Sequence, residues 1–144
     1  MIQGMQMDCP PGWQDRSMLI LSAAQPGGSG VTPNMVVTQD RLPPDLPEAP
    51  EERMAALLDR QVAQMRGQLA NFAEISRRIL AGSRRPTAEL RVDWSSPQAL
   101  LTQWVTFVDA GEGRLLVATG TAGRADFAAA EPVFREMLRS FRLG

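Results

Sequence analysis

Two short apolar runs constrain the fold of this chain more than any other feature. Residues 18–21 (MLIL) follow the polar corner GWQDRS of residues 12–17, and residues 35–37 (MVV) lead into TQDR at residues 38–41. Successive side chains of a β-strand point to opposite faces, and both runs are apolar at odd and even positions. Each run is therefore expected to be covered on both faces, and what covers the second face bears directly on function.

The rest of the sequence predicts a single α+β domain, residues 1–144, with an antiparallel β-sheet flanked by two main α-helices. At 144 residues the chain is long enough to bury one substantial core. Turns rich in Gly, Ser and Pro separate the apolar runs at the spacing of an antiparallel meander. The predicted strands are a short segment around Met5 and Met7, then residues 17–23, 34–39, 73–80, 88–94, 100–108 and 114–121.

Two amphipathic helices are predicted from apolar residues at helical spacing. The first begins at Pro50, because proline suits the first helical turn and Glu51 and Glu52 stabilise the positive end of the helix dipole. Its apolar positions are Met54, Leu57, Leu58, Val62, Met65 and Leu69. The second helix has Pro132 in its expected first full turn and carries Phe127, Phe134, Met137, Leu138 and Phe141. Both helices can pack on the sheet.

The residue types that are missing argue against an enzyme. The chain has no His, no Tyr and no Lys, and all fifteen basic residues are Arg. Most routes to general acid–base or Schiff-base catalysis are therefore closed, and the Asp and Glu residues show no paired spacing. Cys9 is the single cysteine, so neither an intrachain disulfide nor a thiolate metal site is expected. We predict no catalytic residues, no bound metal and no cofactor.

Charge and hydropathy predict neither a nucleic-acid partner nor stable insertion into a membrane. The formal net charge is -1, which gives no long-range attraction to polyanions. A cluster of arginines without interleaved aromatic residues is interpreted as a solvated sheet edge, with phosphate or nucleic acid as the alternative: Arg77, Arg78, Arg84, Arg85 and Arg91. No apolar run has the length of a membrane span or the form of a signal peptide, so a cytoplasmic location is expected.

Methionines and one glutamine are the candidates for recognition. Of eight methionines, several fall in predicted strands, where they fill the core or, if exposed, form an adaptable binding surface. Gln61 lies between Leu58 and Met65 on the first helix, among apolar neighbours. Its amide can donate to and accept from a partner's backbone, although an ordinary boundary position explains it equally well.

Four segments in this order and spacing resemble the DcrB-like family. They are PGWQDRS at residues 11–17, VVTQDR at residues 36–41, RQV at residues 60–62 and FREMLRSF at residues 134–141. The resemblance extends over nearly the whole chain. It implies the Mog1/PsbP-type fold, an antiparallel sheet flanked by helices.

Within that family the chain is most similar to the Eag chaperones of type VI secretion. This likeness implies a homodimer that shields the N-terminal transmembrane segments of a secreted effector before export. It also implies contacts through Met18, Ile20 and Gln61, and it assigns Leu19 and Leu21 to the core. Val37 is added from strand parity on the neighbouring strand. The alternative is a stand-alone Mog1/PsbP-like interaction module that binds a folded partner.

Overall fold

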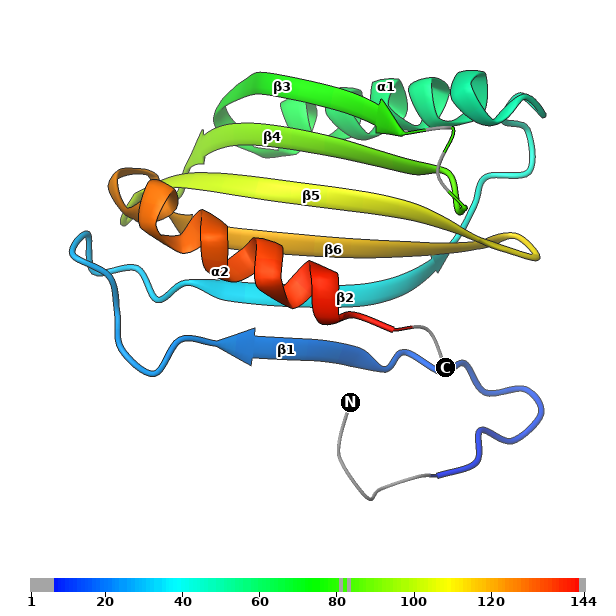
Figure 1. Ribbon diagram of the computed structural model, residues 1–144, viewed down its shortest axis with the longest axis horizontal. Helices are drawn as coiled ribbons and strands as arrows, with labels where there is room; N and C mark the ends of the chain where they lie inside the picture. The colour runs from blue at the N-terminus through cyan, green and yellow to red at the C-terminus, as the bar shows by residue number, and fades with distance from the viewer. Residues whose placement is uncertain (1–6, 81, 83, 143–144) are drawn as a thin grey trace.

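The protein forms one twisted antiparallel β-sheet with a helix on each face (Figure 1). The computed structural model describes residues 7–80, 82 and 84–142. Within these residues the sheet has six strands in the order β1-β2-β6-β5-β4-β3, and every neighbouring pair is antiparallel. The strands are β1 Met18–Ser22, β2 Asn34–Arg41, β3 Ala70–Leu80, β4 Thr87–Ser95, β5 Leu100–Gly111 and β6 Arg114–Gly123.

The first helix, α1 Pro50–Gln68, covers one half of one face of the sheet. It begins with Pro50 in the first turn and Glu51 and Glu52 at its positive end, as the sequence predicts. Its apolar stripe packs on β3, β4 and β5 in a core formed by Leu46, Met54, Leu57, Leu58, Val62, Ala88, Leu90, Val92, Val105, Phe107 and Leu115. We call this face of the sheet the α1 side.

The second helix, α2 Phe127–Ser140, covers the opposite face after a 3-10 turn at Arg124–Asp126. A second core lies under it, formed by Met35, Trp104, Ala118, Ala122, Phe127, Ala130 and Phe134. Gly120 of β6 is required at this contact, because a Cβ atom there would lie 2.7 Å from the Phe134 ring. We call this face the α2 side.

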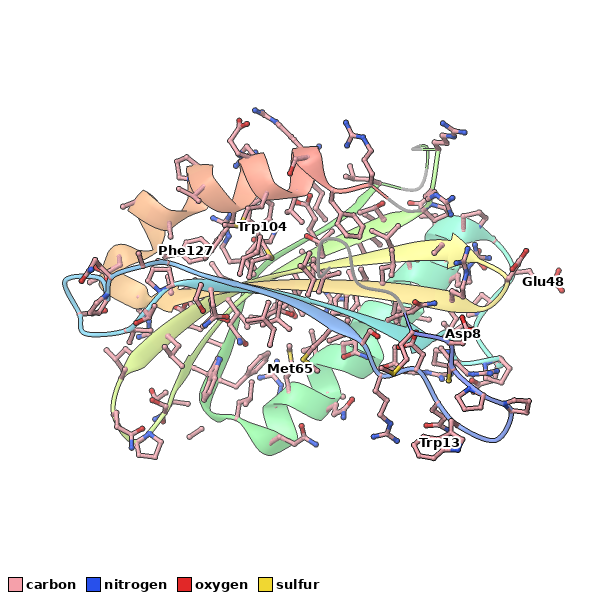
Figure 2. All side chains as sticks on the ribbon, turned by 90° about the horizontal axis from the view of Figure 1, so that it is seen from below. Asp8, Trp13, Glu48, Met65, Trp104 and Phe127 are labelled. Atoms are coloured by element: carbon pink, nitrogen blue, oxygen red, sulfur yellow. The ribbon has the colours of Figure 1, made fainter. Side chains whose placement is uncertain are left out.

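The two helices are displaced toward opposite edges of the sheet (Figure 1). Figure 2 shows α1 and α2 on opposite sides of the strands, with the labelled Met65 on the α1 side and Trp104 near α2. On the α1 side, helix contacts are made with β3 and β4, whereas α2 contacts β6. Strand β1, at the edge beyond β2, therefore lies outside the cover of both helices.

The α+β fold and the predicted strands and helices are confirmed, with two differences. Met7 is 93% exposed and outside any strand, because the alternating pattern is too short to form one; Met5 lies outside the described residues. Pro132 lies in the interior of α2, since the preceding 3-10 turn leads directly into a helix that starts at Phe127. The glycine-rich β1–β2 loop is also tied to the 3-10 turn before α2, by hydrogen bonds from Ser29 to the Asp126 carboxylate.

Candidate functional site

On the α1 side, rows of paired residues run across the strands from beneath α1 to the uncovered edge of the sheet. In one row, Ala88 of β4 and Phe107 of β5 are buried beneath α1, and Val117, Thr38 and Met18 continue the row across β6, β2 and β1. The next row runs from Leu90 and Val105 under the helix to Thr119, Val36 and Ile20. We call the uncovered part the open face, formed by Met18, Ile20, Val36, Thr38, Val117 and Thr119.

Exposure rises steadily along both rows toward the edge strand. Phe107 and Val105 are almost fully buried, Val117 and Val36 are half-buried, and Ile20 is 56% exposed. The open face contains aliphatic, thioether and threonine side chains and no charged group. An apolar surface of this kind, continuous with the core, is typical of a site that a partner covers.

The register places Met18 and Ile20 side by side on the open face, as the resemblance implies. Met18 is 53% exposed, and both side chains point away from the α2 side because alternate residues of β1 face opposite ways. Leu19 and Leu21 do lie on the opposite face, but their assignment to the core is wrong. Leu19 is half-buried and Leu21 is 43% exposed, because α2 packs over β6 and does not cover β1.

Placing Val37 with Met18 and Ile20 is also wrong. Val37 pairs with Leu19 on β1 and with Ala118 on β6, which puts its side chain on the α2 side. There it packs against the core beneath α2. The residue of β2 that lies on the open face is its neighbour Val36, which pairs with Ile20. A shift of one residue exchanges the two faces of a strand, and only the observed pairing fixes which residue faces which side.

Gln61 lies in the sheet-facing stripe of α1, on the half of the stripe nearer the open face. The other flank is defined by Asp59, whose carboxylate pairs with Arg77 of β3 at 2.7 Å. Arg53 and Arg60 mark the near flank, because they pair with Asp109 of β5 and with Asp45 of the β2–α1 linker. Gln61 is turned by about 100° from Arg60 toward the buried Leu57 and Leu58, so it lies between the near flank and the centre of the apolar stripe.

The Gln61 amide is available to a ligand. It is half-buried, and no described residue forms a hydrogen bond with it. Beside it, Arg60 donates two hydrogen bonds to Asp45 at 2.9 and 2.8 Å, which holds the pKa of the Asp45 carboxyl below its usual value. The Arg60 and Asp45 charges beside Gln61 therefore neutralise each other. An unpartnered amide next to an apolar surface can recognise a polar group within an otherwise apolar partner.

A second glutamine extends the site and was missed from the sequence. Gln103 of β5 pairs with Thr121 of β6 on the α1 side, at the row beyond Ile20. It accepts a hydrogen bond from Trp94 Nε1 at 2.9 Å and donates to Thr121 Oγ1 at 3.0 Å. Its amide is therefore held in one orientation at the end of the open face. The sequence pattern of residues 100–108 predicts a strand, but it does not predict which residues of the neighbouring strands lie beside Gln103.

The described part of the chain contains neither a metal-binding cluster nor a membrane-spanning helix. Among residues 7–80, 82 and 84–142, no three His, Cys, Asp or Glu side chains gather as a group able to hold a metal ion. In the same part of the chain, no helix is long and apolar enough to cross a bilayer.

The six-stranded sheet with displaced helices on its two faces defines a protein of the Mog1/PsbP-type fold. The sequence model of the DcrB family matches residues 5–140, and the chain belongs to that family. No curated protein matches the sequence. Family and fold agree with the resemblance carried by the four sequence segments.

Three solved structures share the fold. A protein of unknown function from Pseudomonas aeruginosa, PA94, superposes with a TM-score of 0.80 at 20% identity, covering 100% of this chain and 94% of that one. Cyanobacterial PsbP (CyanoP) from Synechocystis sp. PCC 6803 gives 0.59 at 11% identity, covering 88% and 82%. LpqN of Mycobacterium tuberculosis, involved in cell envelope biogenesis, gives 0.54 at 16% identity, covering 81% and 78%. At these identities the likeness establishes the fold alone.

Proposed function

We propose that this protein is a non-enzymatic cytoplasmic chaperone or adaptor that shields the transmembrane segments of a type VI secretion effector before export. A protein-interaction module is the broader class that the family and fold support. The observation that carries the finer proposal is the open face, with Met18 and Ile20 more than half exposed beside the unpartnered amide of Gln61.

The chemistry of the open face matches an apolar helix. A membrane-spanning helix exposes about twenty apolar residues, which water does not tolerate. Burying the exposed halves of Met18 and Ile20 would contribute about 1 to 1.5 kcal/mol each. Small and polar residues mediate helix packing in lipid, and Gln61 is placed to hydrogen-bond such groups. No step of this role requires a catalytic group.

The dimensions of the open face support a dimer. Three strands spaced about 4.8 Å apart give a width close to the 10–12 Å diameter of one helix. Strand β1 has five residues, so the face is only about 17 Å long at its edge. A membrane helix of about twenty residues is about 30 Å long. One copy would then cover about half of such a helix laid along the strands, and we propose that a homodimer covers the whole.

Binding to an apolar helix can be tested directly. The probe is a labelled peptide of about twenty Leu, Ala and Gly residues with lysines at both ends, and the matched control is an amphipathic helix of equal length. We expect saturable binding of the apolar peptide alone. For the natural partner, co-expression with an effector carrying N-terminal membrane segments should give a complex that is lost when those segments are deleted. Equal binding of the deleted form would contradict the proposal.

Light scattering on the purified protein distinguishes the alternative, a stand-alone module for a folded partner. The chaperone proposal predicts the mass of a dimer. A monomer that also fails to bind the apolar peptide would favour the alternative.

A further inference from the structure

The α2 side carries a second surface that the open face does not use. Beyond α2, toward the β3 edge, lies a pocket of about 280 Å³ lined in part by Ser76, Arg78, Glu89, Arg91 and Trp104. The register places all five on the α2 side, since Ser76 pairs with Arg91, Arg91 with Trp104 and Arg78 with Glu89. We call this the arginine pocket. It lies on the opposite face of the sheet from Met18 and Ile20.

The arginines of the predicted cluster have different environments. Arg77 points to the α1 side, where Glu74 and Asp59 neutralise it and raise its pKa. Arg85 donates to the Ala110 carbonyl oxygen, and Arg84 is exposed in the β3–β4 hairpin. Arg78 is exposed on edge strand β3, as expected of a solvated edge, whereas Arg91 is half-buried on β4. Arg77, Arg78 and Arg91 all line the arginine pocket, but the strand register directs only the side chains of Arg78 and Arg91 to this face.

Arg91 is fixed in place before any ligand arrives. Its guanidinium lies over the rings of Trp104 and Phe127, with 5.6 and 5.0 Å to their centroids. It also donates to the Glu131 carboxylate of α2 at 2.8 Å through one Nη atom. A guanidinium has five N–H groups, so several remain for a further acceptor. Preorganisation of this kind lowers the entropy cost of binding.

Arg78 and Ser76 lie beside Arg91 in the arginine pocket. Ser76 lies directly opposite Arg91, and Arg78 lies diagonal to it on the same face, a position that long side chains reach. No described residue forms an ion pair or hydrogen bond with Arg78. Arginine forks match carboxylate geometry, and a serine hydroxyl adds a third donor.

We propose that the arginine pocket binds a carboxylate side chain in an acidic segment of a partner polypeptide. Glu89, at the rim opposite Arg78, favours a singly charged carboxylate over a doubly charged phosphate because it repels the dianion more strongly. Nucleic acid fits poorly: Trp104, which Arg91 and Arg135 contact at 5.6 and 5.4 Å from the ring centroid, is only 6% exposed and offers no open ring face to a base. This inference does not depend on the role proposed for the open face.

Fluorescence anisotropy tests the pocket with a labelled ten-residue peptide containing four glutamates and its glutamine-substituted counterpart. We expect saturable binding of the acidic peptide that weakens with added salt, and at least tenfold weaker binding of the glutamine peptide. Arg78→Gln should weaken binding about three- to tenfold, and Glu89→Gln should tighten it, because it removes a repulsive charge. The matched control is Arg66→Gln, an exposed arginine of α1 on the other face, which should leave binding unchanged.

Opposite effects of Arg78→Gln and Glu89→Gln on the affinity would support the proposal. If the two side chains only stabilised the fold, neither substitution would increase the affinity. Equal weakening by Arg66→Gln would overturn it in favour of general charge attraction. Inorganic phosphate that competes better than acetate would overturn the assignment to carboxylate. Tighter, Arg78-dependent binding of a single-stranded oligonucleotide would overturn the assignment to a polypeptide, and no binding of the acidic peptide at low salt would overturn the site itself.

Discussion

Replacing Ile20 by Asp is the most informative perturbation of the open face. Ile20 is 56% exposed, so a partner that covers it removes about half of the side chain from water. Full burial of such a side chain contributes about 1.5 to 3 kcal/mol, and the half gained on binding is therefore about 1 to 1.5 kcal/mol. An aspartate in its place must also be desolvated against an apolar helix, which costs about 1 to 3 kcal/mol more. The two terms together, about 2 to 4.5 kcal/mol, should lower the affinity for the apolar peptide about 30- to 2000-fold.

Leu21→Asp is the matched control for this change. Leu21 follows Ile20 on the same edge strand, is 43% exposed and points to the α2 side. Each substitution removes a half-buried aliphatic side chain from an edge strand, so each should lower the free energy of unfolding by about 1 to 2 kcal/mol. Only Ile20→Asp should weaken peptide binding.

The assay combines peptide titration by anisotropy with urea unfolding of both variants. The result expected is a similar shift of the two unfolding midpoints and a large difference between the two binding constants. Equal loss of affinity in both variants would refute the assignment of faces. Global unfolding of Ile20→Asp alone would show that its side chain belongs to the core.

Four further outcomes are expected. Gln61→Ala should weaken binding of a partner helix about three- to tenfold without changing the midpoint of thermal unfolding, because the amide has no partner within the described structure. Gly120→Ala should lower the free energy of unfolding by about 1 to 3 kcal/mol in urea titrations, since its Cβ would overlap the phenyl ring of α2. Gly67→Ala in α1 should raise it by about 0.5 to 1 kcal/mol, because no atom lies within 4 Å of the added Cβ. The hydrogen bond from Arg91 lowers the folded-state pKa of Glu131 below its unfolded value. The stabilisation from this pair is therefore present above the unfolded pKa and is lost as pH falls through the folded pKa, so urea midpoints of Glu131→Gln should depend less on acid pH than those of the native protein.

Local signals predicted most of the fold. Pro50 with Glu51 and Glu52 starts α1 because the first turn of a helix favours these residues wherever it lies in the chain. The strand runs and their turns likewise follow from alternation and from Gly and Pro. The predictions for Met7 and Pro132 were wrong for local reasons. Two alternating residues do not make a strand, and the apolar spacing of the second helix does not mark the 3-10 turn at which α2 begins.

The candidate site was only partly predictable. Met18 and Ile20 share a face because alternation within one strand is fixed by the backbone. Val37 was assigned to the wrong face because the residues of β1 and β2 that share a face depend on the register between the two strands. The apolar pattern within each strand does not determine that register. Gln103 was missed for the same reason: its row is set by pairing with Thr121.

The sequence by itself determined the α+β class, the family and the apolar character of residues 18–21 on both faces of their strand. It could not decide how those faces are covered. The tertiary structure decided this through the placement of α1 over β3, β4 and β5 and of α2 over β6, which leaves β1 beyond both helices. The physical reason is that hydrophobic periodicity indicates which side chains of a segment are buried. Which strands a helix covers depends instead on packing between segments that are distant in the sequence.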